Sequence, residues 1–316
     1  MKVLAPVLTT VALVASAVMA SPMMRQVNES SSTGVTLDLS DVADGTTIDF
    51  TGTTTFETSK WESPLILLTG TDLTGTSIDR PVFFRMSKVI SSTVSAFTIK
   101  NSPYRTFSVL SCESSTINGL TLDSSAGDDV AKNTDGFDLR KNTGVTISGN
   151  TIYNQDDCLA MQSSTNTVFS SNTCSGGHGI SIGSIGGSSV SSSDTVSGLT
   201  VKNNKIVDSV NGIRMKTIID DYGEVTGVTY TDNTLSNVEN AIVIHGDYSK
   251  SEGGYTGSAT SKVTITDITI DGLTGSADTV YDILVDSDVA SGWTFSGIDM
   301  SGDTGSCSGE PSGISC

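Results

Sequence analysis

A short alternating motif of apolar and variable residues recurs along the second half of the chain. The first apolar residue of each copy is residue 137, 159, 180, 213, 242 or 283, so successive copies are 22, 21, 33, 29 and 41 residues apart. Because side chains alternate across a β-strand, Phe137 and Leu139 should face a core and Asp138 should face outward. The copies are Gly136–Leu139, Cys158–Met161, Gly179–Ile182, Gly212–Met215, Ala241–Ile244 and Asp282–Val285.

A second apolar pattern lies between these copies and carries an Asn three residues after its first apolar position. The Asn residues are Asn150, Asn172, Asn204 and Asn233, within Ile147–Ile152, Phe169–Cys174, Val201–Ile206 and Tyr230–Leu235. Two variants, Ile117–Leu122 and Ile265–Ile270, place Leu120 and Ile268 at the Asn position. Stacked Asn side chains can bond to one another along a stack of strands.

Two short strands in each of these intervals, without a helical period, indicate the coils of a solenoid. One coil cannot bury its own apolar positions, whereas stacked coils share a continuous core. A β-propeller is the rival fold, but one blade needs about 40 residues and most intervals here are shorter. We therefore predict an all-β solenoid in a single domain.

The N-terminal segment indicates export. Met1 and Lys2 precede a run of small and apolar residues that ends at Ala20, which is typical of a signal peptide cleaved before Ser21. An uncleaved anchor is the alternative. Residues 1–20 are thus expected to be a signal peptide and residues 21–316 the mature domain, with a glycosylation sequon at Asn28.

Charge and cysteine content narrow the possible partners. The chain has 35 acidic and 17 basic residues, so its net charge of −18 argues against nucleic acid and anionic membranes. Export permits disulfides. Cys158 with Cys174 and Cys307 with Cys316 are the local pairs, which leaves Cys112 as a buried thiol or an intermolecular bridge.

Superposing the coils on their first apolar residue creates a polar column. Asp135, Asp157 and His178 precede that residue by two positions in three successive coils, and Asp156 adjoins Asp157. Adjacent strands lie about 4.8 Å apart, so at least one of the three carboxyl groups should have a raised pKa, which suits a general acid. Arg214 and Lys216, one coil further, suit an anionic substrate.

Each feature alone has an ordinary structural explanation. An Asp-Asp pair often lies in a solvated turn, and an Arg-x-Lys sequence often lies on a wet strand. Their coincidence in one column favours cleavage of a glycosidic bond next to an acidic sugar. Calcium is the other use of stacked carboxylates, but it needs more oxygen ligands than this pattern supplies, so we expect no metal and no cofactor.

Four motifs follow one another through these coils: Asn133–Asp138, Asn154–Cys158, Gly176–Gly179 (continuing to Gly187) and Arg214–Lys216. In these motifs the sequence resembles the polygalacturonases of glycoside hydrolase family 28, with Met215 in place of the more usual Ile, and the resemblance extends from about residue 35 to the C-terminus. The resemblance implies a right-handed parallel β-helix and metal-independent hydrolysis of pectin with inversion.

The resemblance also implies a role for each site residue. Asp156 would protonate the leaving oxygen, Asp135 and Asp157 would activate water, and His178 would tune the acid. Arg214 and Lys216 would bind galacturonate carboxylates, and Tyr248 would line the cleft. Cys158–Cys174 would correspond to the bridge beside the family's active site and Cys307–Cys316 to its C-terminal clasp. The enzyme would be a secreted monomer, and a plant polygalacturonase-inhibiting protein would be a possible partner.

Two departures from the family leave other functions open. The link from Asp72 to Val82 replaces a Gly- and Trp-rich stretch, so about one coil is expected to be absent, and no Cys precedes Cys112. The leading hypothesis is an endo-polygalacturonase that works in mildly acidic conditions. The first alternative is a catalytically impaired relative that binds pectin or an inhibitor protein. The second is a lyase, which would need calcium.

Overall fold

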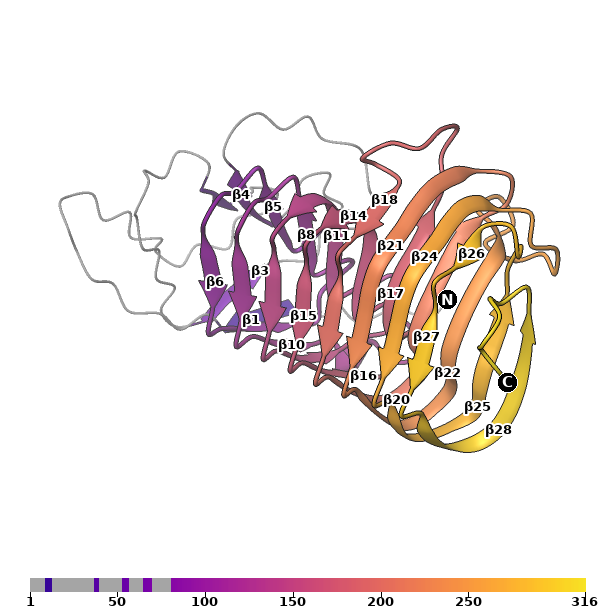
Figure 1. Ribbon diagram of the computed structural model, residues 1–316. Coiled ribbons are helices and arrows are strands. Elements are labelled where there is room, and N and C mark those ends of the chain that lie inside the picture. The colour runs from indigo at the N-terminus through magenta and orange to yellow at the C-terminus, as the bar shows by residue number, and fades with distance from the viewer. Residues whose placement is uncertain (1–8, 13–36, 40–52, 57–64, 70–80) are drawn as a thin grey trace, which may run out of the picture.

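The chain folds as a right-handed parallel β-helix, in which each coil lies beside the previous one (Figure 1). The computed structural model describes residues 9–12, 37–39, 53–56, 65–69 and 81–316. In these residues the only helical element is a 3-10 turn, η1 (Ser125–Gly127), and no helix could span a membrane. The all-β solenoid predicted from the repeats is confirmed, as is the parallel β-helix implied by the family resemblance.

Three strips of parallel strands run along the helix. The first, which we call the site strip, comprises β4 (Ile66–Thr69), β5 (Phe84–Ser87), β8 (Phe107–Leu110), β11 (Phe137–Thr143), β14 (Leu159–Thr165) and β17 (Ile180–Ile185), and it continues into the ends of β20 (Lys205–Ile218), β22 (Thr234–Ser249), β25 (Thr274–Leu284) and β28 (Asp299–Ser308). We call its outward-facing side the site face.

The other two strips complete the coils. The second contains β6 (Thr93–Ser95), β9 (Thr116–Asn118), β12 (Thr146–Ser148), β15 (Val168–Ser170), β19 (Thr200–Lys202), β21 (Tyr222–Thr231), β24 (Lys262–Asp271) and β27 (Thr294–Ser296). The third contains β7 (Thr98–Lys100), β10 (Thr121–Asp123), β13 (Thr151–Tyr153) and β16 (Thr173–Ser175), and then the beginnings of β20, β22, β25 and β28. Smaller strands are β1 (Thr9–Ala12), β2 (Leu37–Asp38), β3 (Thr53–Phe56), β18 (Thr195–Ser197), β23 (Gly254–Tyr255) and β26 (Ala290–Ser291).

The register of the site strip follows the predicted motif for five of its six copies. Phe137, Leu159, Ile180, Ile213 and Ile242 pair in one inward-facing column. The sixth copy was predicted two residues too late, because Tyr281, and not Ile283, pairs with Ile242. Tyr281 is only partly buried and its ring carries a hydroxyl, so the apolar pattern passed over it.

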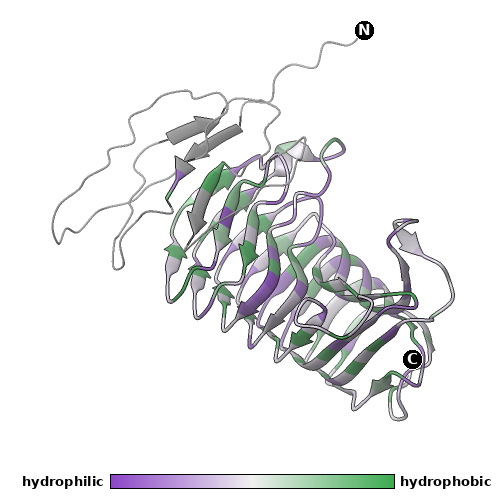
Figure 2. Ribbon diagram, turned by 90° about the horizontal axis from the view of Figure 1, so that it is seen from above, coloured by the Kyte–Doolittle hydropathy of each residue, from purple (hydrophilic) through white to green (hydrophobic). Residues whose placement is uncertain are grey.

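The inward-facing residues form one continuous core. Phe84, Phe107 and Phe137 stack on one another with ring centroids 5.0 and 5.2 Å apart. Hydrophobic bands recur at the same place from coil to coil (Figure 2). Stacking of this kind buries apolar area that one coil would leave in water, at about 25 cal/mol for each Å².

An asparagine ladder links four coils at the bend between the second and third strips. The Oδ1 atoms of Asn172, Asn204 and Asn233 each accept the backbone N–H of the preceding Asn in the stack, at 2.9–3.0 Å. Asn150 Oδ1 likewise accepts the N–H of Leu120 at 2.9 Å. All four side chains are buried and bonded, so the predicted ladder is confirmed.

The predicted extension of the ladder to Ile268 is wrong. The segment equivalent to Tyr230–Leu235 begins at Ile270, since Tyr230 pairs with Ile270 in the second strip. Leu273 therefore follows Asn233 in the stack, and Ile265 and Ile268 instead lie beside Val225 and Val228. Two apolar patterns of similar spacing follow one another here, and the wrong one was chosen.

Both disulfides form as their spacing suggested. Cys158 pairs with Cys174, and Cys307 pairs with Cys316, each with Cα atoms 5.9 Å apart. Cys112 is a buried free thiol whose pKa is raised by burial. Of the two fates left open for Cys112, the structure therefore has the buried thiol.

The first described coils are joined by a short connection. Ile66 of β4 pairs directly with Phe84 of β5, so these two strands are immediate neighbours in the site strip. Most of the link expected to lack a coil, Asp72 to Val82, lies outside the described residues. Strand β1 lies within residues 1–20 and pairs with β3; cleavage of the signal peptide stays a prediction.

Candidate active site

The turns that lead into three consecutive strands of the site strip bring the predicted polar column together. The register that pairs Phe137 with Leu159 and Leu159 with Ile180 places Asp135, Asp157 and His178 at equivalent positions of adjacent coils. The backbone N–H of Gly136 bonds to the carbonyl of Asp157 at 2.9 Å. The stacking inferred from spacing is therefore present, two residues ahead of each strand.

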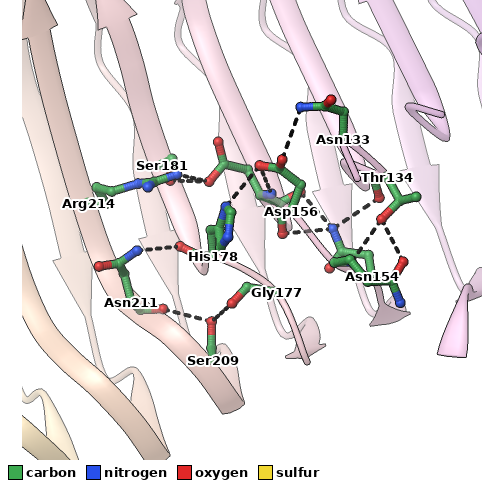
Figure 3. Close-up of polar contacts among 12 residues, drawn as sticks. Asn133, Thr134, Asn154, Asp156, Gly177, His178, Ser181, Ser209, Asn211 and Arg214 are labelled. Atoms are coloured by element: carbon green, nitrogen blue, oxygen red, sulfur yellow. Dashed lines mark hydrogen bonds and ion pairs between the residues drawn. The ribbon is translucent and has the colours of Figure 1, made fainter. Parts of the chain in front are cut away.

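Asp157 is buried and is held by three side chains. Its Oδ1 accepts hydrogen bonds from Ser181 Oγ, at 2.6 Å, and from the Arg214 guanidinium. Its Oδ2 lies 3.6 Å from Lys216 Nζ. Arg214 also donates from Nε to Ser181 Oγ at 2.9 Å, as Figure 3 shows. Two cations and a hydroxyl thus fix the orientation of this carboxylate.

Asp156 is half-buried and forms a pair with His178. Its Oδ1 lies 3.1 Å from His178 Nδ1 and accepts the Asp157 backbone N–H at 2.8 Å, while Oδ2 accepts from Asn133 Nδ2 at 3.3 Å (Figure 3). Burial raises the pKa of Asp156, but the His178 bond and charge, the backbone N–H and Lys216 together hold it below its usual value.

Asn154 fixes the turn that carries both aspartates. Its side-chain Nδ2 lies 2.9 to 3.1 Å from three backbone carbonyl oxygens, those of Thr134, Asp156 and Asp157. Because Asn154 is buried, these bonds connect adjacent coils and limit the freedom of the Asp156–Asp157 turn.

Asp135 and Asp138 are the carboxyl groups whose pKa values rise. Burial raises the pKa of Asp135 well above its usual value, and the charges of Asp138, Asp156 and Asp157 add to the shift. Burial likewise raises the pKa of Asp138 to about 7, although Arg105, with Nε 3.2 Å from Asp138 Oδ2, opposes the rise. The expected high-pKa carboxyl groups exist, but neither is Asp156, the residue expected to be the acid.

The sequence placed Asp138 outward but gave it no role. Asp138 lies in the same outward column as Ser181 and Arg214, within the site. The strand alternation that placed it outward was the available signal. Arg105 lies two positions before Phe107, which pairs with Phe137, so the rule that found Asp135 also finds Arg105 once the repeat is extended to this coil.

Tyr248 lies beside Lys216, with Lys216 Nζ 5.6 Å from the ring centroid. The antiparallel pair of β22 and β23 brings Tyr255 against Tyr248, with ring centroids 6.0 Å apart. Tyr255 also packs on His245, at 4.2 Å between centroids. Tyr248 thus lies beside Lys216, another predicted site residue, whereas Tyr255 was missed because its position depends on a hairpin that folds back.

His245 occupies the position next to Lys216 in the following coil. Its Nδ1 lies 2.8 Å from Asp247 Oδ1, and its Nε2 lies 3.0 Å from Asp282 Oδ1. Burial lowers the pKa of His245, but the two carboxylates outweigh burial and raise it. The sequence gave no sign of this arrangement, because Asp282 comes from the next coil.

Asp156, Asp157 and His178 are also the only group in the described part of the chain whose geometry could hold a metal ion. One ligand atom from each lies within 4.8 Å of the others. The same atoms already bond to cations or to one another: Asp157 to Arg214 and Lys216, and Asp156 to His178. A metal ion would have to displace these partners, so the site fits a proton-transfer role better.

Sequence comparison identifies relatives over most of the chain. The family model of glycosyl hydrolases family 28 matches residues 77–316. A polygalacturonase of Penicillium janthinellum is 43% identical over 313 residues, which cover 90% of this chain and 82% of the relative. Endopolygalacturonase I of Aspergillus niger is 42% identical over 90% of this chain and 83% of the relative.

Solved structures show the same architecture. The endo-xylogalacturonan hydrolase from Aspergillus tubingensis superposes with a TM-score of 0.64 at 22% identity, over 80% of this chain and 78% of that one, a similarity that concerns the fold. Endopolygalacturonase I from Stereum purpureum, complexed with two galacturonate molecules, gives a TM-score of 0.56 at 27% identity, over 80% and 84% of the two chains.

The family match begins at residue 77, within the link from Asp72 to Val82, and the absence of a coil there stays a prediction.

Proposed function

The chain belongs to glycoside hydrolase family 28, and from this premise we propose that it is an endo-acting polygalacturonase that hydrolyses α-1,4-galacturonosyl linkages of homogalacturonan with inversion. Polygalacturonases and endopolygalacturonases at 39 to 44% identity support the substrate and the endo mode. The observation that carries the proposal is the stack of Asp135, Asp157 and His178, with Asp156 held by His178 and Asp157 by Arg214 and Lys216.

In the proposed reaction, Asp156 protonates the leaving glycosidic oxygen as the bond from C1 to that oxygen breaks. Asp135 and Asp157 take a proton from a water molecule that attacks C1 from the opposite face. The two carboxyl functions must be far enough apart to admit this water, as inverting glycosidases require. The product therefore has the opposite anomeric configuration at C1.

The proton needed by Asp156 belongs to a coupled cluster. The charge of Asp156 contributes to the raised pKa of Asp135, so Asp135 can keep the proton taken from water and pass it to Asp156 for the next cycle. His178 Nδ1 at 3.1 Å from Asp156 Oδ1 can return a proton to Asp156 between cycles.

Arg214, Lys216 and Tyr248 bind the galacturonate units next to the cut in this proposal. Arg214 presents a planar fork of donors, and Lys216 presents a point charge beside the Tyr248 ring. A substrate carboxylate that approaches these cations also approaches Asp157. The acidic sugar is thereby positioned with its C1 near the activated water.

The test compares the parent protein with Asp156→Asn on polygalacturonate. Loss of the general acid should lower the release of reducing ends by about 10²–10⁴-fold while the thermal midpoint stays close to that of the parent. Equal rates in the two proteins would refute the mechanism. Early products of mixed length would support endo action, whereas monomer alone would indicate exo action.

The impaired, binding-only alternative has no support in the described residues, because every predicted site side chain is present there and in register. Pectin binding without turnover by a folded parent protein would revive it.

We further propose that residues 1–20 are a signal peptide and that residues 21–316 form a secreted, monomeric domain. An N-terminus near Ser21 in the exported protein and a monomer mass by light scattering would support this. We also propose that a plant polygalacturonase-inhibiting protein binds this protein.

A further inference from the structure

Two arginines lie on the site face on the N-terminal side of the catalytic column. Arg85 is in β5, and Arg105 lies just before β8. The strand register places Arg85 in the same outward column as Asp138 and Arg214. This column runs through Arg85, Ser108, Asp138, Ala160, Ser181 and Arg214 in six successive coils.

Arg105 is already held by its neighbours. Its Nε lies 3.2 Å from Asp138 Oδ2, and its guanidinium lies 5.1 Å from the centroid of the Tyr104 ring. Asp138, Asp135 and Asp156 all act on it electrostatically. The contact with Asp138 is an ion pair and not a hydrogen bond, since Arg105 Nε and both Asp138 carboxylate oxygens lack a hydrogen-bond partner in the part of the chain that the structure describes. An aromatic ring and a carboxylate charge thus stabilise this cation.

Arg85 has no such compensation. Its Nε is buried without a hydrogen-bond acceptor, and no ion pair of Arg85 forms within the described part of the chain. Burial and the positive charge of Arg105 lower the pKa of Arg85, and no carboxylate of the described residues opposes them. Asp138 therefore neutralises Arg105, whereas Arg85 has no acidic partner among the described residues.

The partly buried, unpaired Arg85 beside Arg105 lowers the stability of the fold, and an acidic residue near Arg85 would remove this cost. A partly buried cation without a partner is unfavourable, and a like charge nearby increases the cost. The chain has 35 acidic residues, and only six of its 17 basic residues are arginines. Three of those six, Arg85, Arg105 and Arg214, lie at the site. An anion arriving from solution would relieve the repulsion.

We propose that Arg85 and Arg105 form a second carboxylate-binding subsite, which holds a galacturonate unit of the polymer on the N-terminal side of the cut. The proposal rests on the proposed function, since that function supplies the polyanionic ligand. Arg85 provides the free donors, which can bind a carboxylate through two parallel bonds. Arg105 adds positive charge while it remains bound to Asp138.

The position of the subsite has a consequence for ligand length. Arg85 and Arg214 are five strand spacings apart, which is about 24 Å at about 4.8 Å for each spacing. Only a ligand of several sugar units can contact both arginines. The subsite thus favours long chains over short oligomers and is compatible with cleavage inside a polymer.

Calorimetric binding of hexagalacturonate to proteins that also carry Asp156→Asn, so that the ligand is not consumed, tests the subsite. Arg85→Gln should raise the dissociation constant about tenfold and lower its salt dependence. Lys202→Gln removes the same charge from an exposed position on β19, in the second strip, and should leave the dissociation constant within about twofold. Arg105 is left intact because its loss would also free Asp138.

A second ligand separates binding from a merely structural role. With fully methyl-esterified hexagalacturonate, which lacks the carboxylates, Arg85→Gln should have no effect. An equal loss for both ligands, or no loss for the acidic one, would overturn the subsite. If Arg85→Gln lowers the thermal midpoint strongly, Arg85→Met, which keeps the aliphatic stem, replaces it with the same expected outcomes.

Different experimental outcomes refute the proposed function and the proposed subsite. If the parent protein binds hexagalacturonate with the Arg85 dependence described but releases no reducing ends, the subsite stands and the hydrolase assignment falls. If the parent hydrolyses polygalacturonate and Arg85→Gln binds the acidic ligand as tightly as the protein that retains Arg85, the assignment stands and the subsite falls.

Discussion

At the scale of single residues, Asp138 shows how burial and one ion pair decide a protonation state. Its pKa of about 7 lies above the value of about 3.9 expected in the unfolded chain. The folded state therefore binds this proton more tightly, and stability falls as the pH rises from about 4 through 7. Above pH 7 the ionised group lies buried beside other carboxylates.

We predict that Asp138→Asn stabilises the protein at pH 8 by an amount on the order of a few kcal/mol and changes stability little at pH 4. The amide mimics the protonated carboxyl group, so it removes the cost of ionisation. Urea unfolding at the two pH values measures the difference. A variant that is less stable than the parent at pH 8 would show that the ion pair with Arg105 dominates.

Arg214 illustrates the value of a planar cation. It bonds to Ser181 from Nε and to Asp157 from its terminal nitrogen. Lysine cannot make both bonds, so Arg214→Lys should lower kcat/KM on polygalacturonate by about 10- to 100-fold. Arg140→Lys, at an exposed position of β11, is the matched control. Similar kcat/KM values in the two variants would mean that charge alone suffices at Arg214.

The sequence predicted those site residues that follow from strand spacing. Asp135, Asp157 and His178 lie two positions before a strand, so their alignment required only the repeat. Arg105 lies at the same position before Phe107, in a coil to which the repeat was not extended. Tyr255 instead reaches the site through a hairpin, a contact that depends on how the turn folds and that strand spacing does not specify.

At the scale of elements, the asparagine ladder connects coils through buried side chains. Asn172 Oδ1 accepts from both the backbone N–H and the Nδ2 of Asn150, at 3.0 and 2.9 Å. Removing Asn172 would leave these two donors buried without partners. The cost of each is about 1–3 kcal/mol.

We predict that Asn172→Ala lowers the free energy of unfolding by about 2–5 kcal/mol, as measured by urea denaturation. Thr151→Ala, at an exposed position of β13, should change it by less than about 0.5 kcal/mol. If the two variants have the same stability, water must replace the lost amide in the ladder.

The strips were predictable because their apolar periods are strong and repeat in most coils. The prediction failed near residues 265 to 285, where two patterns of similar spacing overlap and Tyr281 takes an inward position. It also gave no sign that β20 and β22 run without a break from the third strip into the site strip.

At the scale of the whole molecule, opposing pKa shifts set how stability depends on pH. The pKa values of Asp135, Asp138 and His245 are raised, so the stability associated with these groups is lost as the pH increases. The pKa values of Asp156 and Asp282 are lowered, so the stability that they contribute is lost as the pH falls through and below about 4.

We therefore predict that the thermal midpoint is higher at pH 5 than at pH 8, with a steep loss below pH 4. Scanning calorimetry across pH 3 to 9 measures the curve. In His245→Gln the decline above about pH 6.5 should be shallower, because that histidine no longer titrates. A midpoint that rises steadily from pH 5 to 8 would contradict the assigned shifts.

The direct pairing of β4 with β5 has a consequence for how such proteins diversify. Each coil contacts only its two neighbours, so a whole coil can be gained or lost while the chemistry several coils away keeps its geometry. Lineages can therefore vary the number of sugar units that an enzyme grips independently of how it breaks the bond. Gene changes of one coil's length are the expected unit of that variation.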